Sequence, residues 1–420
     1  MGKIKKIKAR QLLDSRGTPT IEAEIHSEKF TARAIVPSGA STGTHEALEL
    51  RDNGKQFNGK SVLKAVENVN KKIAPKLLGR NPSKQNELDE LMIELDGTEN
   101  KSVLGANAVL SVSMALCKLG ALEEGMPLHM HLLKLSGKKK PFLPVPQMNV
   151  LNGGRHAGID NDIQEHMIAP VKAKDFSTAL RIGAEIYAAL KEELKKEFGF
   201  QGVLIGDEGG FVPAIDNVRE RLELMEKVTE EVGYSKEVFF ALDSAASEFF
   251  KEGNYFIKEK EYLAGELIDF YKELVEEFPV YSLEDALSED DWNGWKELTE
   301  KLGKKVQIVG DDLLVTNMKR IERAVKEKSC NALLLKINQI GTITESIKAG
   351  NFALKNDWGL IVSHRSGETE DSFIADLAVG INASQSKFGA PARSERNAKY
   401  NQLIRIEETN SEYAGRKMKI

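Results

Sequence analysis

Five apolar runs in the second half of the chain constrain its fold most, because each ends in a charged or titratable side chain and they recur about every 25 to 40 residues. That interval is close to the length of a unit of one strand and one helix. A strand that is buried on both faces reads as a continuous apolar run. The runs are Phe239–Asp243, Val280–Glu284, Val306–Asp311, Leu333–Lys336 and Leu360–His364.

The ends of these runs predict a functional site. If the strands close into a (βα) barrel, their carboxyl ends meet at one mouth, where barrel enzymes carry out their chemistry. Three carboxylates, one lysine and one histidine would then face one another. The pattern therefore predicts an α/β barrel with a metal site and a base beside it.

The length of 420 residues favours two domains. Near the start, Thr20–Ile25 and Phe30–Val36 alternate as strands do, and helical periodicity follows. Strands followed by helices favour a small α+β domain. Pro141, Pro144 and Pro146 follow within a few residues, so we place the boundary near Lys138 to Pro144. We expect an N-terminal domain of residues 1–138 and a barrel domain of residues 139–420.

The barrel domain reads as strands and helices that alternate to its end. Each helix candidate lies between apolar runs, as a barrel requires. The candidates are Asp175–Phe198, Asn217–Val232, Ala264–Phe278, Trp292–Leu302, Asn317–Lys328 and Thr342–Lys355.

Composition excludes several classes of function. The net charge of −5 gives no reason to expect nucleic acid as a partner, and we interpret the lysine-rich start, Lys3 to Lys8, as a solvated strand or tail. No stretch approaches the length of a transmembrane helix and no signal peptide is visible, so we expect no membrane association and a cytoplasmic location. Cys117 and Cys330 are far apart in sequence and are expected to be buried thiols in a reducing compartment.

Each acid at the end of a run has a simpler explanation when taken alone. Asp243 precedes Ser244, and Asp311 precedes Asp312, so either could cap a helix or a turn. Three successive runs with this ending, followed by Lys336, favour a site instead, because a buried lysine opposite three acids is costly unless a task requires it. Oxygen ligands favour Mg²⁺ over zinc. Such a site can remove a proton next to a carboxylate.

Long motifs at these positions resemble the enolase family. The resemblance runs from Asp14 to Glu408, almost the whole chain, and long motifs in the family's order are far more specific than one short motif. They are Ser38–Gly43, Asn149–Gly154, Gly206–Gly210, Leu333–Thr342 and Ser363–Asp371.

The resemblance implies a barrel of the enolase kind with a smaller N-terminal α+β capping domain. It also implies the reversible Mg²⁺-dependent dehydration of 2-phospho-D-glycerate to phosphoenolpyruvate in glycolysis and gluconeogenesis. Asp243, Glu284 and Asp311 would hold a first Mg²⁺. Ser41 would join a second Mg²⁺ that arrives with the substrate.

Further roles follow from the resemblance at matching positions. Lys336 would remove the C2 proton, and Glu208, with Glu165 beside it, would help the C3 hydroxyl to leave. Lysine is a poor base at its usual pKa of ~10.4, and nearby divalent charge would lower that pKa. The other implied site residues are His364 near the leaving group, Lys387 at the substrate carboxylate, Arg365 and Ser366 at the phosphate, and His156 and Gln164 in contact with substrate.

The resemblance also implies a homodimer, or an octamer built of dimers. The chain departs from the family's pattern at His166 and in the acidic loop of residues 158–162. Ala286 and the segment around Lys387 differ as well. Two alternatives therefore stay open: an enolase-like Mg²⁺-dependent lyase that acts on a related 2-hydroxy acid, and a noncatalytic scaffold on the same fold.

Overall fold

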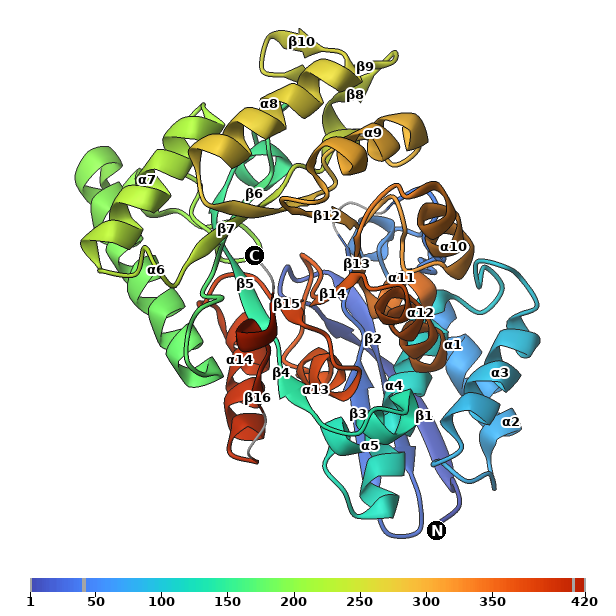
Figure 1. Ribbon diagram of the computed structural model, residues 1–420. Coiled ribbons are helices and arrows are strands. Elements are labelled where there is room, and N and C mark those ends of the chain that lie inside the picture. Colours follow the sequence, from blue (N-terminus) through green and yellow to red (C-terminus); the bar gives the residue numbers. More distant parts are fainter. Residues whose placement is uncertain (1, 40–42, 410–411, 419–420) are drawn as a thin grey trace.

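The computed structural model describes residues 2–39, 43–409 and 412–418 (Figure 1). The chain opens with an antiparallel sheet of three strands, β1 (Lys6–Leu13), β2 (Pro19–His26) and β3 (Thr31–Ile35), in that order. The second and third strands are confirmed, and burial alternates along β3, but β2 is buried on both faces over residues 19–25. Ile21, for example, is fully buried, because one face of this sheet packs on helix α4.

Helices follow this sheet, as the sequence predicts. Residues 106–124 form α4, which is long and apolar enough to span a membrane by length and composition. The expectation that no segment approaches that length is therefore wrong, yet 83% of the apolar window of α4 is buried inside the protein, as in a core helix. The helices are α1 (Leu63–Asn68), α2 (Ala74–Leu77), α3 (Gln85–Asp96), α4 (Ala106–Glu124) and α5 (Leu128–Ser136).

The second part of the chain closes into a barrel of eight strands in the order β11-β12-β13-β14-β15-β5-β6-β7. The fold class is the predicted one: a smaller N-terminal α+β part is followed in the chain by a C-terminal α/β barrel. The strands are β5 (Val145–Asn152), β6 (Glu165–Ala169), β7 (Phe239–Asp243), β11 (Val280–Glu284), β12 (Gln307–Gly310), β13 (Ala332–Leu335), β14 (Gly359–Ser363) and β15 (Gln385–Lys387).

One barrel strand breaks the expected alternation. Strand β6 runs antiparallel to both neighbours, whereas the other adjacent strands are parallel. Residues 153–164 join β5 directly to β6 without a crossover helix, and two helices then precede β7. The prediction of strict strand–helix alternation is wrong here, because an antiparallel neighbour can be reached by a loop, whereas a parallel one needs a crossover.

The six predicted helices are present, with ends within one residue of those predicted. Several predicted first residues are the N-caps. Asp175, Asn217, Asn317 and Thr342 each accept a hydrogen bond from a backbone N–H of the first turn. The helices are α6 (Phe176–Phe198), α7 (Val218–Glu231), α8 (Ala264–Glu277), α9 (Trp292–Leu302), α10 (Met318–Glu327) and α12 (Ile343–Lys355).

Further elements were not predicted. They comprise the short α11 (Ile337–Ile340), α13 (Phe373–Gly380), α14 (Ser394–Glu407), a small sheet of β8 (Phe250–Lys251), β9 (Asn254–Ile257) and β10 (Lys260–Tyr262), and a pair of β4 (Phe142–Leu143) with β16 (Glu412–Tyr413).

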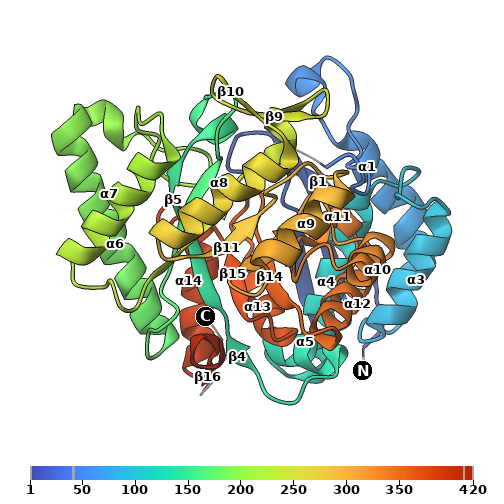
Figure 2. The same cartoon turned by 45° about the horizontal axis from the view of Figure 1, so that its top comes forward.

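The N-terminal part packs against one side of the barrel. Figure 2 shows α3 beside α12, and the two helices are in contact. The buried Lys101 reaches across to Glu345, with its Nζ 2.9 Å from Oε2. Lys118 Nζ lies 2.7 Å from Asp371 Oδ1. These contacts hold the first part of the chain next to the mouth of the barrel.

Candidate active site

The antiparallel direction of β6 brings a carboxylate to the mouth of the barrel. Glu165 is the first residue of β6 and pairs in register with Asp243, the last residue of β7. Glu165 therefore lies at the same end of the barrel as the acids that close the parallel strands. The next side chain, His166, points to the opposite face of the strand.

His166 is a buried core histidine that lies away from the site. Burial, together with the charge of Arg221, holds its pKa well below the usual range. Its imidazole is therefore neutral. A histidine next to Glu165 could alter the proton affinity of that acid or could be a core residue, and the geometry favours the core residue.

Lys387 joins three carboxylates at the mouth. Its Nζ lies 2.8 Å from Asp243 Oδ2, 2.8 Å from Glu284 Oε1 and 3.1 Å from Glu165 Oε2. Burial alone would lower the pKa of Lys387, but the charges of Asp243, Glu165 and Glu284 hold it well above the usual range. Lys387 is thus a fixed cation at the centre of the acid cluster.

Lys336 follows β13 and forms an ion pair with Asp311. Burial opposes its charge, but Asp311 raises the pKa of Lys336 above the usual range. The other oxygen of Asp311 accepts a hydrogen bond of 2.8 Å from Gln339 Nε2. As the structure stands, Lys336 is therefore protonated, and it needs added positive charge nearby to become a base.

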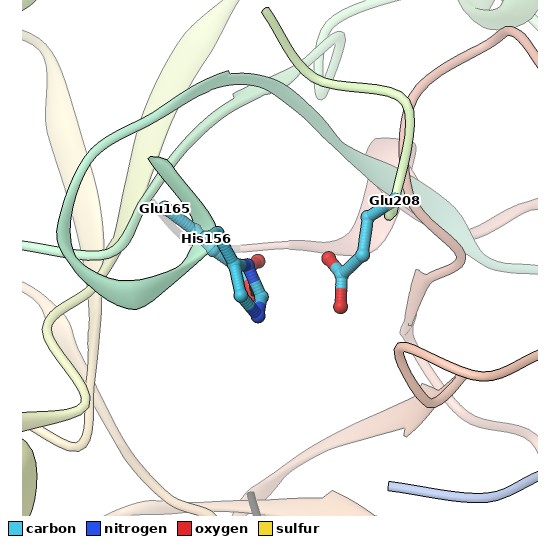
Figure 3. A group of neighbouring side chains, drawn as sticks. All are labelled: His156, Glu165 and Glu208. Atoms are coloured by element: carbon cyan, nitrogen blue, oxygen red, sulfur yellow. Dashed lines mark ion pairs between the residues drawn. The ribbon is translucent and has the colours of Figure 1, made fainter. Parts of the chain in front are cut away.

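Glu165 and Glu208 form a pair of carboxyls beside this cluster. Figure 3 shows Glu165 and His156 facing Glu208, and one ligand atom from each of the three lies within 4.8 Å of the others. Burial and the charge of Glu208 raise the pKa of Glu165 well above the usual range. Burial opposes the charge of Glu208, but the neighbouring His364, His156 and Arg396 hold the pKa of Glu208 well below its usual range. A proton shared by the Glu165–Glu208 pair therefore rests on Glu165.

Glu208 is fixed by contacts from three parts of the barrel. Asn149 Nδ2 donates to Glu208 Oε2 at 3.2 Å, and Ser366 Oγ donates to Glu208 Oε1 at 3.4 Å. His364 Nε2 lies 3.2 Å from Glu208 Oε2. The loop of residues 206–210 thus presents this carboxyl to the pocket in a set orientation.

The donor set fits Mg²⁺. Asp243, Glu284 and Asp311 stand at the ends of the neighbouring strands β7, β11 and β12, and all three are buried. Burial and then the charge of Asp243 raise the pKa of Glu284 well above the usual range. Buried oxygen ligands with excess negative charge suit a hard divalent ion. In this structure, the ammonium groups of Lys336 and Lys387 offset the negative charge of these carboxylates.

A second acidic group lies next to these three acids, and the sequence did not predict it. Asp285, Asp311 and Asp312 offer ligand atoms within 4.8 Å of one another. Both oxygens of Asp285 accept backbone N–H groups, from Asp311 and Asp312, at 2.9 Å each. Asp285 therefore positions the turn after β12. The only feature of the sequence that could have identified Asp285 as a residue of the site is its position directly after Glu284.

Arg365 is held by an acid from the N-terminal part. Its Nη1 and Nη2 lie 3.0 and 3.1 Å from the two oxygens of Glu46, and Nη1 donates to Asn338 Oδ1 at 3.0 Å. A guanidinium fork that holds a carboxylate in this way can equally hold two oxygens of a phosphate. Glu46 was not predicted, because nothing local in the sequence links it to residue 365.

The predicted site residues gather at one pocket. Ser41 lies outside the described residues, and Glu284 stands at the pocket's edge, bonded to Lys387. The pocket is also lined by Ala245, Asp285, Asp312 and Ser363, which were not predicted. The predicted residues that line it are His156, Gln164, Glu165, Glu208, Asp243, Asp311, Lys336, His364, Arg365, Ser366 and Lys387.

A barrel mouth that combines a buried lysine, a proton-holding carboxyl pair and a cluster of oxygen ligands defines an enzyme that abstracts a proton next to a carboxylate. Residues 4–132 match the family described as "Enolase, N-terminal domain", and residues 140–420 match "Enolase, C-terminal TIM barrel domain". The chain belongs to the enolase family.

Two relatives that are similar over nearly the whole chain support the same family. The sequence is 55% identical over 404 residues to the enolase of Thermococcus gammatolerans, an alignment that covers 95% of this chain and 93% of that protein. It is 53% identical over 416 residues to the enolase of Methanocaldococcus jannaschii, which covers 98% and 97% respectively. The resemblance seen in the sequence is confirmed.

Proposed function

We propose that this protein is the hydro-lyase that dehydrates 2-phospho-D-glycerate to phosphoenolpyruvate, reversibly and with Mg²⁺. The observation that carries the proposal is that one pocket gathers Lys336, the Glu165–Glu208 pair, Arg365 and two of the three acids for a metal, Asp243 and Asp311. A proton acceptor, a proton donor and an anion-binding group are what this dehydration needs. The family assignment supports the same reaction.

The first step is removal of the proton at C2 by Lys336. The substrate carboxylate gains negative charge as the proton leaves, and Lys387 is placed to stabilise it. Asp243, Glu284 and Asp311 would hold one Mg²⁺, and Ser41 would join a second that arrives with the substrate. Bound Mg²⁺ would supply positive charge that stabilises the carboxylate and disfavours the protonated form of Lys336.

The second step is loss of the C3 hydroxyl as water. The Glu165–Glu208 pair supplies the proton through Glu208, with His364 beside it. Arg365 and Ser366 would hold the phosphate, so that Arg365 exchanges the carboxylate of Glu46 for phosphate oxygens. His156 and Gln164 line the remaining wall in contact with substrate.

A direct assay tests the reaction. Purified protein with 2-phosphoglycerate and Mg²⁺ should give the rising absorbance of the conjugated product, and EDTA should abolish it. An Arg365→Met variant should lose most of the activity, because the phosphate contact is lost. Turnover of an unphosphorylated 2-hydroxy acid, with none of 2-phosphoglycerate, would support the related lyase instead. If the protein turns over neither substrate, the result would support the noncatalytic scaffold on the same fold.

The remaining expectations are part of the same proposal. We propose a cytoplasmic homodimer, or an octamer of dimers, with small molecules as its partners, no nucleic acid and no membrane. The negative net charge supports the exclusion of nucleic acid. We also keep the division into residues 1–138 and 139–420. Light scattering of the purified protein distinguishes dimer from octamer.

A further inference from the structure

One fully buried arginine at the site has no role in the steps above. Arg396 lies in α14 and is 0% exposed. Its Nη1 donates to Arg365 O at 2.6 Å, and its Nη2 donates to Ser366 O at 2.6 Å and to Asp207 O at 2.9 Å. One side chain thus ties together the backbones that carry Glu208, Arg365 and Ser366.

Arg396 also contacts His364. Its Nη1 lies 2.7 Å from His364 Nδ1. A guanidinium can only donate hydrogen bonds, so Nδ1 must accept. A neutral imidazole that accepts at Nδ1 carries its proton on Nε2. The arginine contact therefore decides the tautomer of His364.

The proton on Nε2 faces the pocket. Among the described residues, His364 Nε2 is buried and has no hydrogen-bond partner, since it lies 3.2 Å from Glu208 Oε2 without the alignment of a hydrogen bond. A buried donor without a partner is costly. An oxygen of the substrate next to Glu208 would satisfy it.

The surroundings leave this arrangement little freedom. A Cβ added at Gly389 would lie 3.0 Å from Arg396 Cδ, 3.0 Å from His364 Cε1 and 2.7 Å from Glu208 O. Burial, opposed by Glu208 and reinforced by the charge of Arg396, lowers the pKa of His364 to about 4. The imidazole is therefore neutral at neutral pH.

We propose that Arg396 is a positioning residue that holds His364 as the Nε2-protonated neutral tautomer, so that His364 donates a hydrogen bond to the departing C3 hydroxyl beside Glu208. The inference rests on the proposed function for the identity of that hydroxyl. His364 then acts as a donor that steadies the leaving oxygen, and Glu208 delivers the proton that completes the water.

The tautomer can be measured without any assay of activity. The intact protein, labelled with ¹⁵N-histidine, is studied by ¹⁵N NMR at pH 7.5, and the His364 signals are identified by their loss in His364→Gln. We expect an unprotonated Nδ1 and a protonated Nε2. A protonated Nδ1 in the unsubstituted protein would overturn the proposal.

Variants of Arg396 separate positioning from packing. Arg396→Met removes the donor and should shift His364 towards a mixture of tautomers. It should slow dehydration about 10²-fold, the lower range for a positioned acid–base group, and slow C2 hydrogen–deuterium exchange much less. Arg396→Lys keeps a donor and should retain the tautomer. Asn401→Ala, at an exposed position of the same helix, is the control that should change neither readout.

The outcomes are distinct. A folded Arg396→Met protein that keeps the original tautomer, or loses exchange and dehydration equally, would contradict the positioning role. If Arg396→Met does not fold, the unsubstituted protein and Arg396→Lys still decide the tautomer. An unsubstituted protein that has the expected tautomer but turns over no 2-phosphoglycerate would refute the proposed function alone.

Discussion

At the scale of single residues, the site is dominated by charges that offset one another. The ammonium groups of Lys336 and Lys387 pair with buried carboxylates, and both lysine pKa values are raised. As the proposed base, Lys336 stays protonated until other positive charge takes over its carboxylate partner. The chemistry proposed for Lys336 is thus coupled to the binding of metal proposed for its neighbouring side chains.

The low pKa of His364 makes a prediction for stability. Its pKa falls from 6.5 to about 4 on folding. Between pH 6.5 and 4 the unfolded chain binds a proton that the folded protein does not, so the free energy of unfolding decreases as the pH falls. This residue contributes at most about 1.4 kcal/mol per pH unit.

Replacing His364 should remove that contribution. Urea unfolding of the unsubstituted protein and of His364→Gln, measured at several pH values from 7 to 4.5, gives the difference in slope. We expect a shallower decline in the variant. Equal slopes would show that His364 binds its proton equally well in the folded and unfolded states.

At the scale of elements, the reversed strand β6 depends on the loop that leads into it. Arg221 of α7 forms a fully buried ion pair with Asp162 of this loop, and its Nε donates to Ile215 O at 3.1 Å. Lys258 N donates to Asn161 O at 2.7 Å from the other side. The acidic loop that departs from the family pattern is thus anchored at its end, next to Gln164 and Glu165.

This anchor can be tested by a double-mutant cycle. Asp162→Leu should cost about 3–5 kcal/mol of unfolding free energy, because it leaves the buried charge of Arg221 unpaired. Arg221→Met should cost less, because Lys258 Nζ still lies 3.5 Å from Asp162 Oδ2. The double variant should cost much less than the sum. The exposed pair of Arg323 and Glu327, 2.8 Å apart, is the control and should couple by about 0.3–0.5 kcal/mol. Additive costs at the buried pair would refute the anchor.

The sequence predicted those helices and strands whose ends are marked by residues close to them in the chain. Apolar runs that end in acids marked the barrel strands, and capping residues marked the helix starts to within one residue. The direction of β6 was not predictable, since a short apolar run reads alike in either direction. Helix α13 was missed because it is buried all round and so shows no amphipathic period. The contact of Glu46 with Arg365 was not predictable, because it joins residues 319 positions apart in the sequence. The contacts of Arg396 were not predictable either, because this residue lies outside the motifs that the sequence analysis identified.

At the scale of the whole molecule, the site is assembled from both parts of the chain. Arg365 of the barrel pairs with Glu46 of the N-terminal part, and Thr44 Oγ1 donates to Glu289 Oε1 at 2.7 Å nearby. The N-terminal part therefore covers the mouth and supplies an acid that pairs with the arginine proposed to bind phosphate. Binding of ions at the mouth should consequently stabilise the whole fold.

Mg²⁺ should raise the free energy of unfolding. Because only the folded protein assembles the ligands, Mg²⁺ at 100 times its dissociation constant should add about 2.7 kcal/mol, and EDTA should remove it. Asp243→Asn should weaken this gain. Asp269→Asn, on the exposed face of α8, is the control and should leave the gain intact. A gain that survives Asp243→Asn unchanged would place the ion elsewhere.

The most direct test of the central claim is the comparison of two substitutions in one pocket. Lys336→Ala should stop the exchange of the C2 hydrogen of 2-phosphoglycerate with deuterium, because it removes the base. Glu208→Gln should block dehydration yet retain that exchange, because it removes only the acid. If both folded, Mg²⁺-binding variants lose exchange to the same extent, the assignment of Lys336 as base and Glu208 as acid is wrong.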